Sequence, residues 1–120
     1  MNLCIFGSRD FDNYEMLEFA IDEYRKKHRV DEIISGCAKG ADALGERYAD
    51  EHQIKVDKNP ADWNLHGKSA GYKRNVIMAK KCDVAIGFWD GESKGTKQMI
   101  DYVKSLGKPC YVIKYKEYEI

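Results

Sequence analysis

Five short strand-like stretches alternate along this chain with stretches that repeat apolar residues at helical spacing, and this alternation restricts the fold most. They span residues 3–6, 32–35, 54–59, 83–89 and 110–113, and the stretch 54–59 is the weakest because charged residues interrupt it. Continuous apolar runs of this length are typical of strands that are buried on both faces. Strands that alternate with helices form parallel sheets through right-handed crossovers. We therefore expect an α/β sandwich of three layers, with about five strands in the order 3-2-1-4-5 and helices on both faces.

The helices are expected over residues 13–28, 41–50 and 71–81, followed by a fourth that stops at Gly107 and Pro109. Asn13 is a suitable N-cap for the first helix, because its side chain can accept a hydrogen bond from a free amide. In the third helix, Ile77, Met78 and Tyr72 are expected to face the core. Residues 60–70 form a long irregular stretch in this interpretation, and such loops inside a compact domain are often functional.

The composition predicts one ordinary globular domain over residues 1–120. Lysine plus arginine and aspartate plus glutamate number 20 each, so the net charge is zero. This balance argues against broad nucleic-acid binding, which depends on excess positive charge. The four cysteines lack zinc-ligand spacing, so we expect no metal and interpret them as reduced thiols of a cytoplasmic protein. No apolar run approaches the roughly 20 residues of a membrane span, so we expect no membrane contact.

The stretch Ser-Gly-Cys-Ala-Lys-Gly-Ala-Asp over residues 35–42 joins an expected strand to an expected helix through two glycines. Glycines let the backbone approach an anion, and the first amides of a helix have no intrahelical partner. The spacing matches neither a Walker A loop nor Gly-x-Gly-x-x-Gly. A tight connection alone would also explain the glycines, and Asp42 alone would also suit a helix start. The phosphate-binding candidates in this stretch are Ser35, Gly36, Cys37, Lys39, Gly40 and Asp42.

The strand order places two further loops beside this one. In such sheets, ligands bind beyond the carboxyl ends of the strands where the order reverses, here between the first and fourth strands. The first strand ends in Gly7-Ser8-Arg9, and the fourth is followed by residues 90–96. Because the loops meet at one edge, we expect an anion site there. The additional candidates are Gly7, Ser8, Arg9, Lys68, Arg74, Asn75, Asp90, Ser93, Gly95 and Thr96, and Trp63 or Trp89 could stack on a base.

The chain resembles the SLOG superfamily of Rossmann-like domains, and in particular its small single-domain branch related to YspA and YpsA. The matching stretches are Phe-Gly-Ser-Arg-Asp-Phe from residue 6, Ile-Ser-Gly-Cys-Ala-Lys-Gly-Ala-Asp from residue 34, Pro-Ala-Asp-Trp from residue 60, Gly-Tyr-Lys-Arg-Asn from residue 71, and Phe-Trp-Asp-Gly from residue 88 through Gly95-Thr96. Cys37 departs from the family pattern, which usually has glycine there. The resemblance implies a Rossmann-like fold that binds a nucleotide or nucleotide-derived ligand, without a required cofactor.

The superfamily is similar in fold to the Lonely Guy phosphoribohydrolases and to the Rossmann domain of the DNA-processing protein A. Lonely Guy enzymes carry Pro-Gly-Gly-x-Gly-Thr-x-x-Glu, but the glutamate position here is Met99. Arg74 matches the arginine that partners this glutamate, and Asp90 or Glu92 are the candidate catalytic substitutes. Loss of the carboxylate favours a binding module for sensing or sequestration over the two alternatives, a nucleotide N-glycosidase and a single-stranded nucleic-acid binder. Aromatic residues on the expected helices favour a homodimer or higher oligomer in addition.

Overall fold

The computed structural model describes residues 1–116, and the last four residues lie outside the described part. Its strands are β1 (Asn2–Gly7), β2 (Glu32–Ser35), β3 (Lys55–Lys58), β4 (Val84–Trp89) and β5 (Cys110–Lys114). They form one parallel sheet in the order β3-β2-β1-β4-β5, as expected. Central β1 pairs with β2 on one side and with β4 on the other, with Leu3 opposite both Ile33 and Val84.

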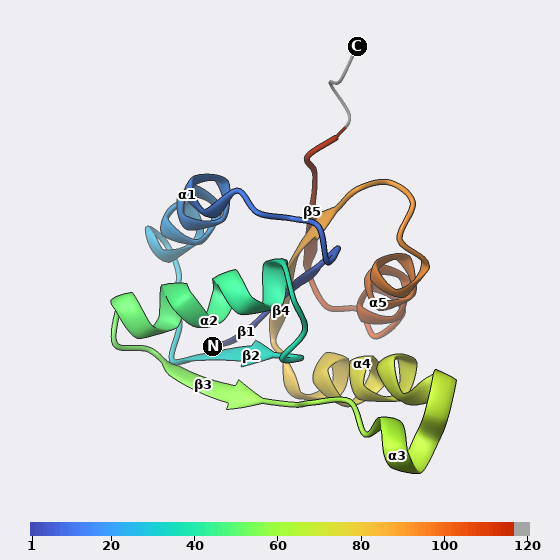
Figure 1. The fold of residues 1–120 in the computed structure, drawn as a ribbon. Helices are drawn as coiled ribbons and strands as arrows, with labels where there is room; N and C mark the ends of the chain where they lie inside the picture. Colours follow the sequence, from blue (N-terminus) through green and yellow to red (C-terminus); the bar gives the residue numbers. More distant parts are fainter. Residues whose placement is uncertain (117–120) are drawn as a thin grey trace.

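Helices cover both faces of the sheet, which confirms the three-layer α/β architecture (Figure 1). The helices are α1 (Tyr14–Arg25), α2 (Ala41–Glu51), α3 (Trp63–His66), α4 (Ala70–Lys81) and α5 (Lys94–Ser105). Side chains alternate across β1, so Leu3 and Ile5 pack with α1 and α2, whereas Cys4 and Phe6 pack with α4 and α5. This division into two apolar cores explains why the β1 run is apolar at every position.

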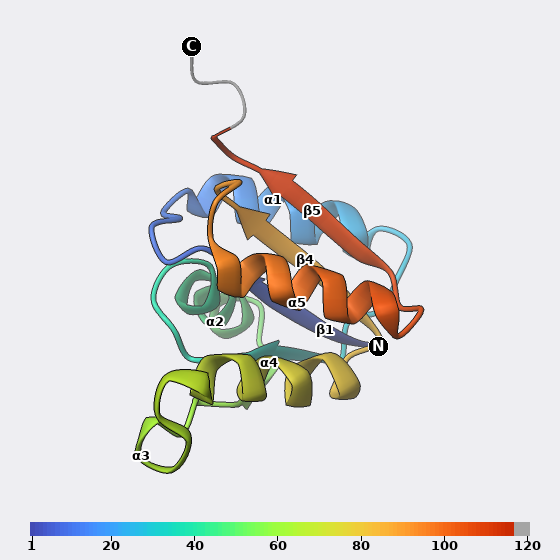
Figure 2. The ribbon, with the colours of Figure 1, turned by 90° about the vertical axis from the view of Figure 1, so that its right-hand side faces the viewer.

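Two expectations about the middle of the chain were wrong. Residues 60–70 are not wholly irregular, because they contain α3 and a 3₁₀ turn, η1 (Gly67–Ser69). The Asp62 carboxylate caps α3 by accepting the Leu65 amide at 3.0 Å. Figure 2 shows that this segment projects from the body beyond the start of α4. Ile77 and Tyr72 are also exposed, at 51% and 44%, whereas Met78 is buried as expected and Asn75 lies on the same buried side of α4.

The start of α5 also differs from the expectation in a way that matters for the site. Residues 90–96 were expected as a loop, but the helix already begins at Lys94 and Ser93 is its N-cap. Gly95 and Thr96 therefore lie in the first helical turn, close to amides without intrahelical partners. Among the described residues, no helix combines the length and the apolar character needed to cross a membrane.

Candidate functional site

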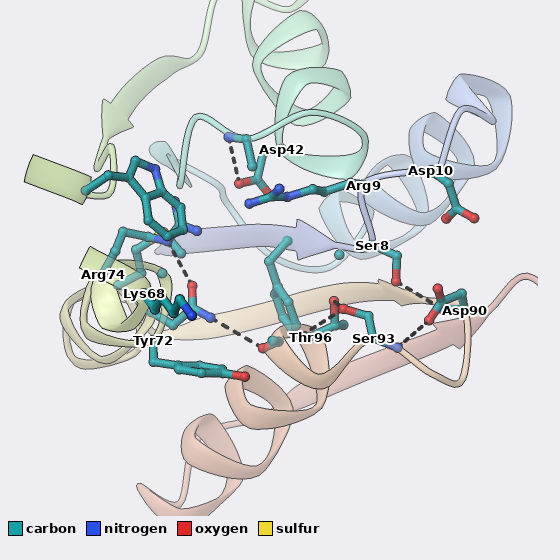
Figure 3. Close-up of a pocket in the computed structure, with 18 residues that line it drawn as sticks. Ser8, Arg9, Asp10, Asp42, Lys68, Tyr72, Arg74, Asp90, Ser93 and Thr96 are labelled. Atoms are coloured by element: carbon teal, nitrogen blue, oxygen red, sulfur yellow. Dashed lines mark hydrogen bonds between the residues drawn. The ribbon is translucent and has the colours of Figure 1, made fainter. Parts of the chain in front are cut away.

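A cleft of about 520 Å³ lies at the carboxyl edge of the sheet, where β1 and β4 diverge into their loops (Figure 3). One wall comes from the β1 loop and the start of α2, and the other from α4 and the start of α5. Eleven of the residues predicted from the sequence line it: Gly7, Ser8, Arg9, Asp42, Lys68, Arg74, Asn75, Asp90, Ser93, Gly95 and Thr96. The strand order thus brings together the three loops that the sequence analysis singled out.

A second hollow of about 530 Å³ adjoins the cleft and shares Arg9, Ala38, Trp63 and Arg74 with it. The predicted residues Gly36, Cys37 and Lys39 line this second hollow and not the main cleft. The glycine loop therefore presents its backbone between the two hollows.

The predicted residues Ser35, Gly40 and Glu92 line neither hollow. The buried Ser35 hydroxyl donates to a Glu46 carboxylate oxygen at 2.6 Å and accepts the Cys37 amide at 3.1 Å. Gly40 has a φ of 79°, and a Cβ there would lie 2.4 Å from the Ser8 carbonyl oxygen. Its role is thus to let α2 start against the β1 loop. Glu92 lines a separate hollow beside α5.

Asp42 places its carboxylate within the glycine loop. Its Oδ2 accepts the Ala38 amide at 3.2 Å, although the residue is only 4% exposed. Burial raises the pKa of Asp42 to about 6, while the Ala38 amide and the positive charge of Arg74 act in the opposite direction. One backbone amide of the glycine loop, which was expected to bind phosphate, therefore already donates a hydrogen bond to a carboxylate of the protein.

Arg74 reaches this loop from α4, 38 residues further along the chain. Its Nη1 donates to the Gly36 carbonyl, and its Nε donates to Asn75 Oδ1 at 2.9 Å. The side-chain amide nitrogen of Asn75 in turn donates to Gln98 Oε1 at 3.0 Å and to the Gly95 carbonyl at 3.4 Å. Because these bonds occupy the Asn75 side chain, it positions the arginine and joins α4 to α5.

The loop after β4 is held by its own polar side chains. Asp90 Oδ1 accepts the amides of Glu92 at 2.9 Å and Ser93 at 2.7 Å, and the Asp90 amide donates to Ser8 Oγ at 3.2 Å. Burial raises the pKa of Asp90, but these amides and Ser8 outweigh it and leave the pKa below its usual value. The Ser93 hydroxyl accepts the Thr96 amide at 3.3 Å. Asp90 therefore remains ionised and shapes the loop.

The cationic side chains of the cleft form no close ion pairs in the described part of the chain, although Arg74 lies beside the Asp42 carboxylate. Arg9, Lys68 and Arg74 form no ion pair with any residue in the range 1–116. Lys68 and Arg74 lie with Tyr72 toward one end, and Ser8 and Asp90 lie toward the other (Figure 3). This distribution leaves cationic groups available for an anion.

Six other residues also line the cleft, and the sequence analysis did not predict them as ligand contacts. They are Phe6, Asp10, Ala38, Gly71, Tyr72 and Met78. Tyr72 is 44% exposed, and Trp63, considered earlier as a base-stacking residue, also lines the cleft and is 51% exposed. The Asp10 carboxylate is engaged by the Tyr115 hydroxyl and the Lys116 ammonium group. Tyr72 directly precedes the Lys-Arg-Asn stretch in the sequence, and this position was the available signal that it lines the cleft. Between residues 1 and 116, no cluster of three metal-ligating side chains occurs.

Comparison with known proteins identifies the family of the chain. The model of the YspA, cpYpsA-related SLOG family matches residues 1–66, which include the β1 loop and the glycine loop. The Gene 61 protein of Mycobacterium phage D29 is 30% identical over 112 residues, which cover 88% of this chain and 90% of the phage protein. No solved structure matched the chain significantly. The chain therefore belongs to the YspA, cpYpsA-related SLOG family.

Proposed function

We propose that the cleft binds a nucleotide or a nucleotide-derived small molecule, and that the protein acts as a sensing or sequestering module. One observation carries this proposal: three cationic side chains that form no ion pair among the described residues share a cleft with two exposed aromatic rings. Cationic groups favour a phosphate, and aromatic rings can stack on a base. The volume of about 520 Å³ lies within the roughly 300–1,000 Å³ range of small-molecule sites.

The start of α5 supports an anion in the same cleft. Gly95 lines the cleft, and no atom lies within 4 Å of the position that its Cβ would occupy. An anion can therefore approach the first turn of the helix, where amides without intrahelical partners and the helix dipole both favour negative charge. Lys68 and Arg74 line the cleft that this turn opens into.

Binding is favoured over hydrolysis because α5 contributes no carboxylate to the cleft. Met99, at the position of the Lonely Guy glutamate, is fully buried in the core beneath α4 and α5. Of the two candidate substitutes, Glu92 lies outside the cleft, and Asp90 is occupied by two backbone amides.

Thermal unfolding with a panel of nucleoside monophosphates, nucleoside diphosphates, ADP-ribose and cyclic nucleotides tests the proposal. A ligand at 100 times its dissociation constant stabilises the folded protein by about 2.7 kcal/mol. We expect Arg9→Ala and Arg74→Ala each to weaken binding of the stabilising nucleotide. Lys80→Ala is the matched control, because Lys80 is exposed on the same helix as Arg74 and lies outside the cleft.

Tryptophan fluorescence provides a second readout. In a Trp89→Phe background, Trp63 is the remaining tryptophan, and its emission should change when a base stacks on it. Unchanged melting temperature and unchanged Trp63 emission across the panel would refute the proposal. A nucleic-acid polymer would instead bind with a steep dependence on salt concentration.

A further inference from the structure

We propose that Asp42 selects the sugar of the bound nucleotide, because its carboxylate accepts a hydrogen bond from a ribose hydroxyl group. The cleft then binds ribonucleotides in preference to analogues that lack the contacted hydroxyl group, at either the 2′ or the 3′ position. This inference rests on the proposed nucleotide-binding function and adds to it a specificity that the fold does not by itself imply. It concerns a side chain that lines the cleft from the first turn of α2.

The glycine loop holds the Asp42 carboxylate in place as an acceptor. The Ala38 amide donates to Oδ2 at 3.2 Å, and the Gly36 amide also favours the ionised form. The Arg74 guanidinium lies beside it, since a single Cβ built on Gly36 would contact Arg74 Cζ and Asp42 Oδ2, each at 2.8 Å. An ionised carboxylate only accepts hydrogen bonds. This part of the wall therefore suits a neutral donor and repels a phosphate.

Each carboxylate of the cleft has donors in the protein, but Asp42 is buried, whereas Asp10 is exposed and Asp90 is half-buried. Asp10 is engaged by Tyr115 and Lys116, and Asp90 Oδ1 accepts two backbone amides. Asp42 differs because burial disfavours its ionised form, so an added hydrogen bond from a ligand is worth more to it. Among the cleft carboxylates, Asp42 is thus the one that gains most from a ligand donor.

A ribose hydroxyl fits this position because of where Arg74 lies. Arg74 is one of the cations expected to take the phosphate, and it adjoins Asp42. In a nucleotide, the sugar lies directly beside the phosphate, whereas an exocyclic amine lies at the far end of the base. A ligand whose phosphate contacts Arg74 therefore presents its sugar hydroxyls to Asp42 before any group of its base.

The test compares the affinities of adenosine 5′-monophosphate (AMP) and its 2′-deoxy and 3′-deoxy forms by calorimetry. We expect the wild-type protein to bind AMP at least about tenfold more tightly than one deoxy form, which corresponds to about 1.4 kcal/mol. In Asp42→Asn this preference should fall below about threefold. Asp10→Asn, which also removes a carboxylate from the cleft wall, should keep the wild-type preference. Inosine 5′-monophosphate distinguishes a ribose hydroxyl from the exocyclic amine of the base as the donor to Asp42, because it lacks that amine.

A pH series on the wild-type protein tests the inference even if Asp42→Asn does not fold. The preference for AMP should shrink as the pH falls through about 6, where Asp42 takes up a proton. The groups that act on Asp42 are Arg74 of α4, Glu46 of α2, Cys4 of β1 and Cys37 of the glycine loop. Both nucleotides carry the same phosphate, so its own titration cancels in the ratio.

The outcomes separate the two proposals. If the wild-type protein binds no nucleotide, the proposed function fails, and this inference fails with it. If it binds AMP and both deoxy forms equally, or if Asp42→Asn keeps the full preference, the function stands and the role of Asp42 is refuted. A third result would also refute the role of Asp42 in sugar selection. In this result, the protein discriminates between AMP and inosine 5′-monophosphate but shows no sugar preference, and the discrimination disappears in Asp42→Asn. Asp42 would then contact the base.

Discussion

Replacing Gly36 with alanine should impair the site while the fold stays intact. A Cβ on Gly36 would lie 2.6 Å from Arg74 Nη1 and 2.8 Å from Asp42 Oδ2. Both atoms end flexible side chains, so the backbone can stay in place. The guanidinium must withdraw by about 0.8 Å to reach an ordinary contact distance of 3.4 Å. This movement lengthens the hydrogen bond from Arg74 to the Gly36 carbonyl and shifts the guanidinium relative to the cleft.

The expected cost to stability is small. A hydrogen bond to a charged group contributes about 1.5–3 kcal/mol, and water can replace the carbonyl at the half-buried Arg74. We therefore expect a loss of about 1 kcal/mol, or roughly 4 °C in melting temperature for a domain of this size. The loss of nucleotide affinity should be at least about tenfold, because the displacement moves the Arg74 guanidinium away from the position in which it is proposed to contact the phosphate.

Calorimetric titration with the nucleotide that stabilises the wild-type protein measures this loss. Arg74→Met should lose a similar amount of affinity, and the double variant Gly36→Ala/Arg74→Met should bind no more weakly than Arg74→Met alone. Additive losses would show that alanine at position 36 acts independently of Arg74. Wild-type affinity in Gly36→Ala would refute the reasoning, since the arginine would then not contact the ligand.

Two further predictions concern stability. Because burial raises the Asp42 pKa from 3.8 to about 6, the folded protein holds more protons than the unfolded chain between these values. The contribution of Asp42 to the free energy of unfolding should thus fall as pH rises from about 4 to 6, by at most about 3 kcal/mol. Asp42→Asn should melt above the wild-type protein at pH 7.5 and equally below pH 4; a constant difference would contradict this. Gly45→Ala should cost about 1–3 kcal/mol in urea unfolding, because its Cβ would lie 2.9 Å from Ile5 Cγ2; unchanged stability would show that α2 shifts freely on β1.

Patterns that depend on neighbouring residues in sequence were predicted well. The strand over residues 32–35, the cap at Asn13 and the strand order all follow from local apolar runs and their alternation. The α3 helix was missed although Asp62 precedes it as a cap, because four residues are too few to show helical periodicity. Ile77 was misplaced because only the packing of α4 shows which of its sides is covered.

The interior of the site could not be predicted in the same way. That the Ala38 amide points at Asp42 depends on the backbone at Cys37, which adopts a φ of 62°. Non-glycine residues seldom adopt this left-handed conformation, so Cys37 itself gave no sign of it, although the family pattern usually has glycine at this position. The bond from Arg74 to Gly36 joins residues far apart in the chain and forms only when α4 packs against the sheet. The residue types indicated an anion site, but only the structure shows that the Ala38 amide already donates a hydrogen bond to the Asp42 carboxylate.

The central position of β1 has a consequence for synthesis on the ribosome. Leu3 pairs with Ile33 on one side and with Val84 on the other. At about 5–20 residues per second, the roughly 80 residues between Leu3 and Val84 take about 4–16 s to emerge. Both edges of β1 are unpaired until β2 emerges, and the edge that β4 will cover stays unpaired for the rest of the interval. An unpaired edge can pair with another chain. The residues that close this edge also complete the cleft, so a ligand can bind only after the most aggregation-prone stage has passed.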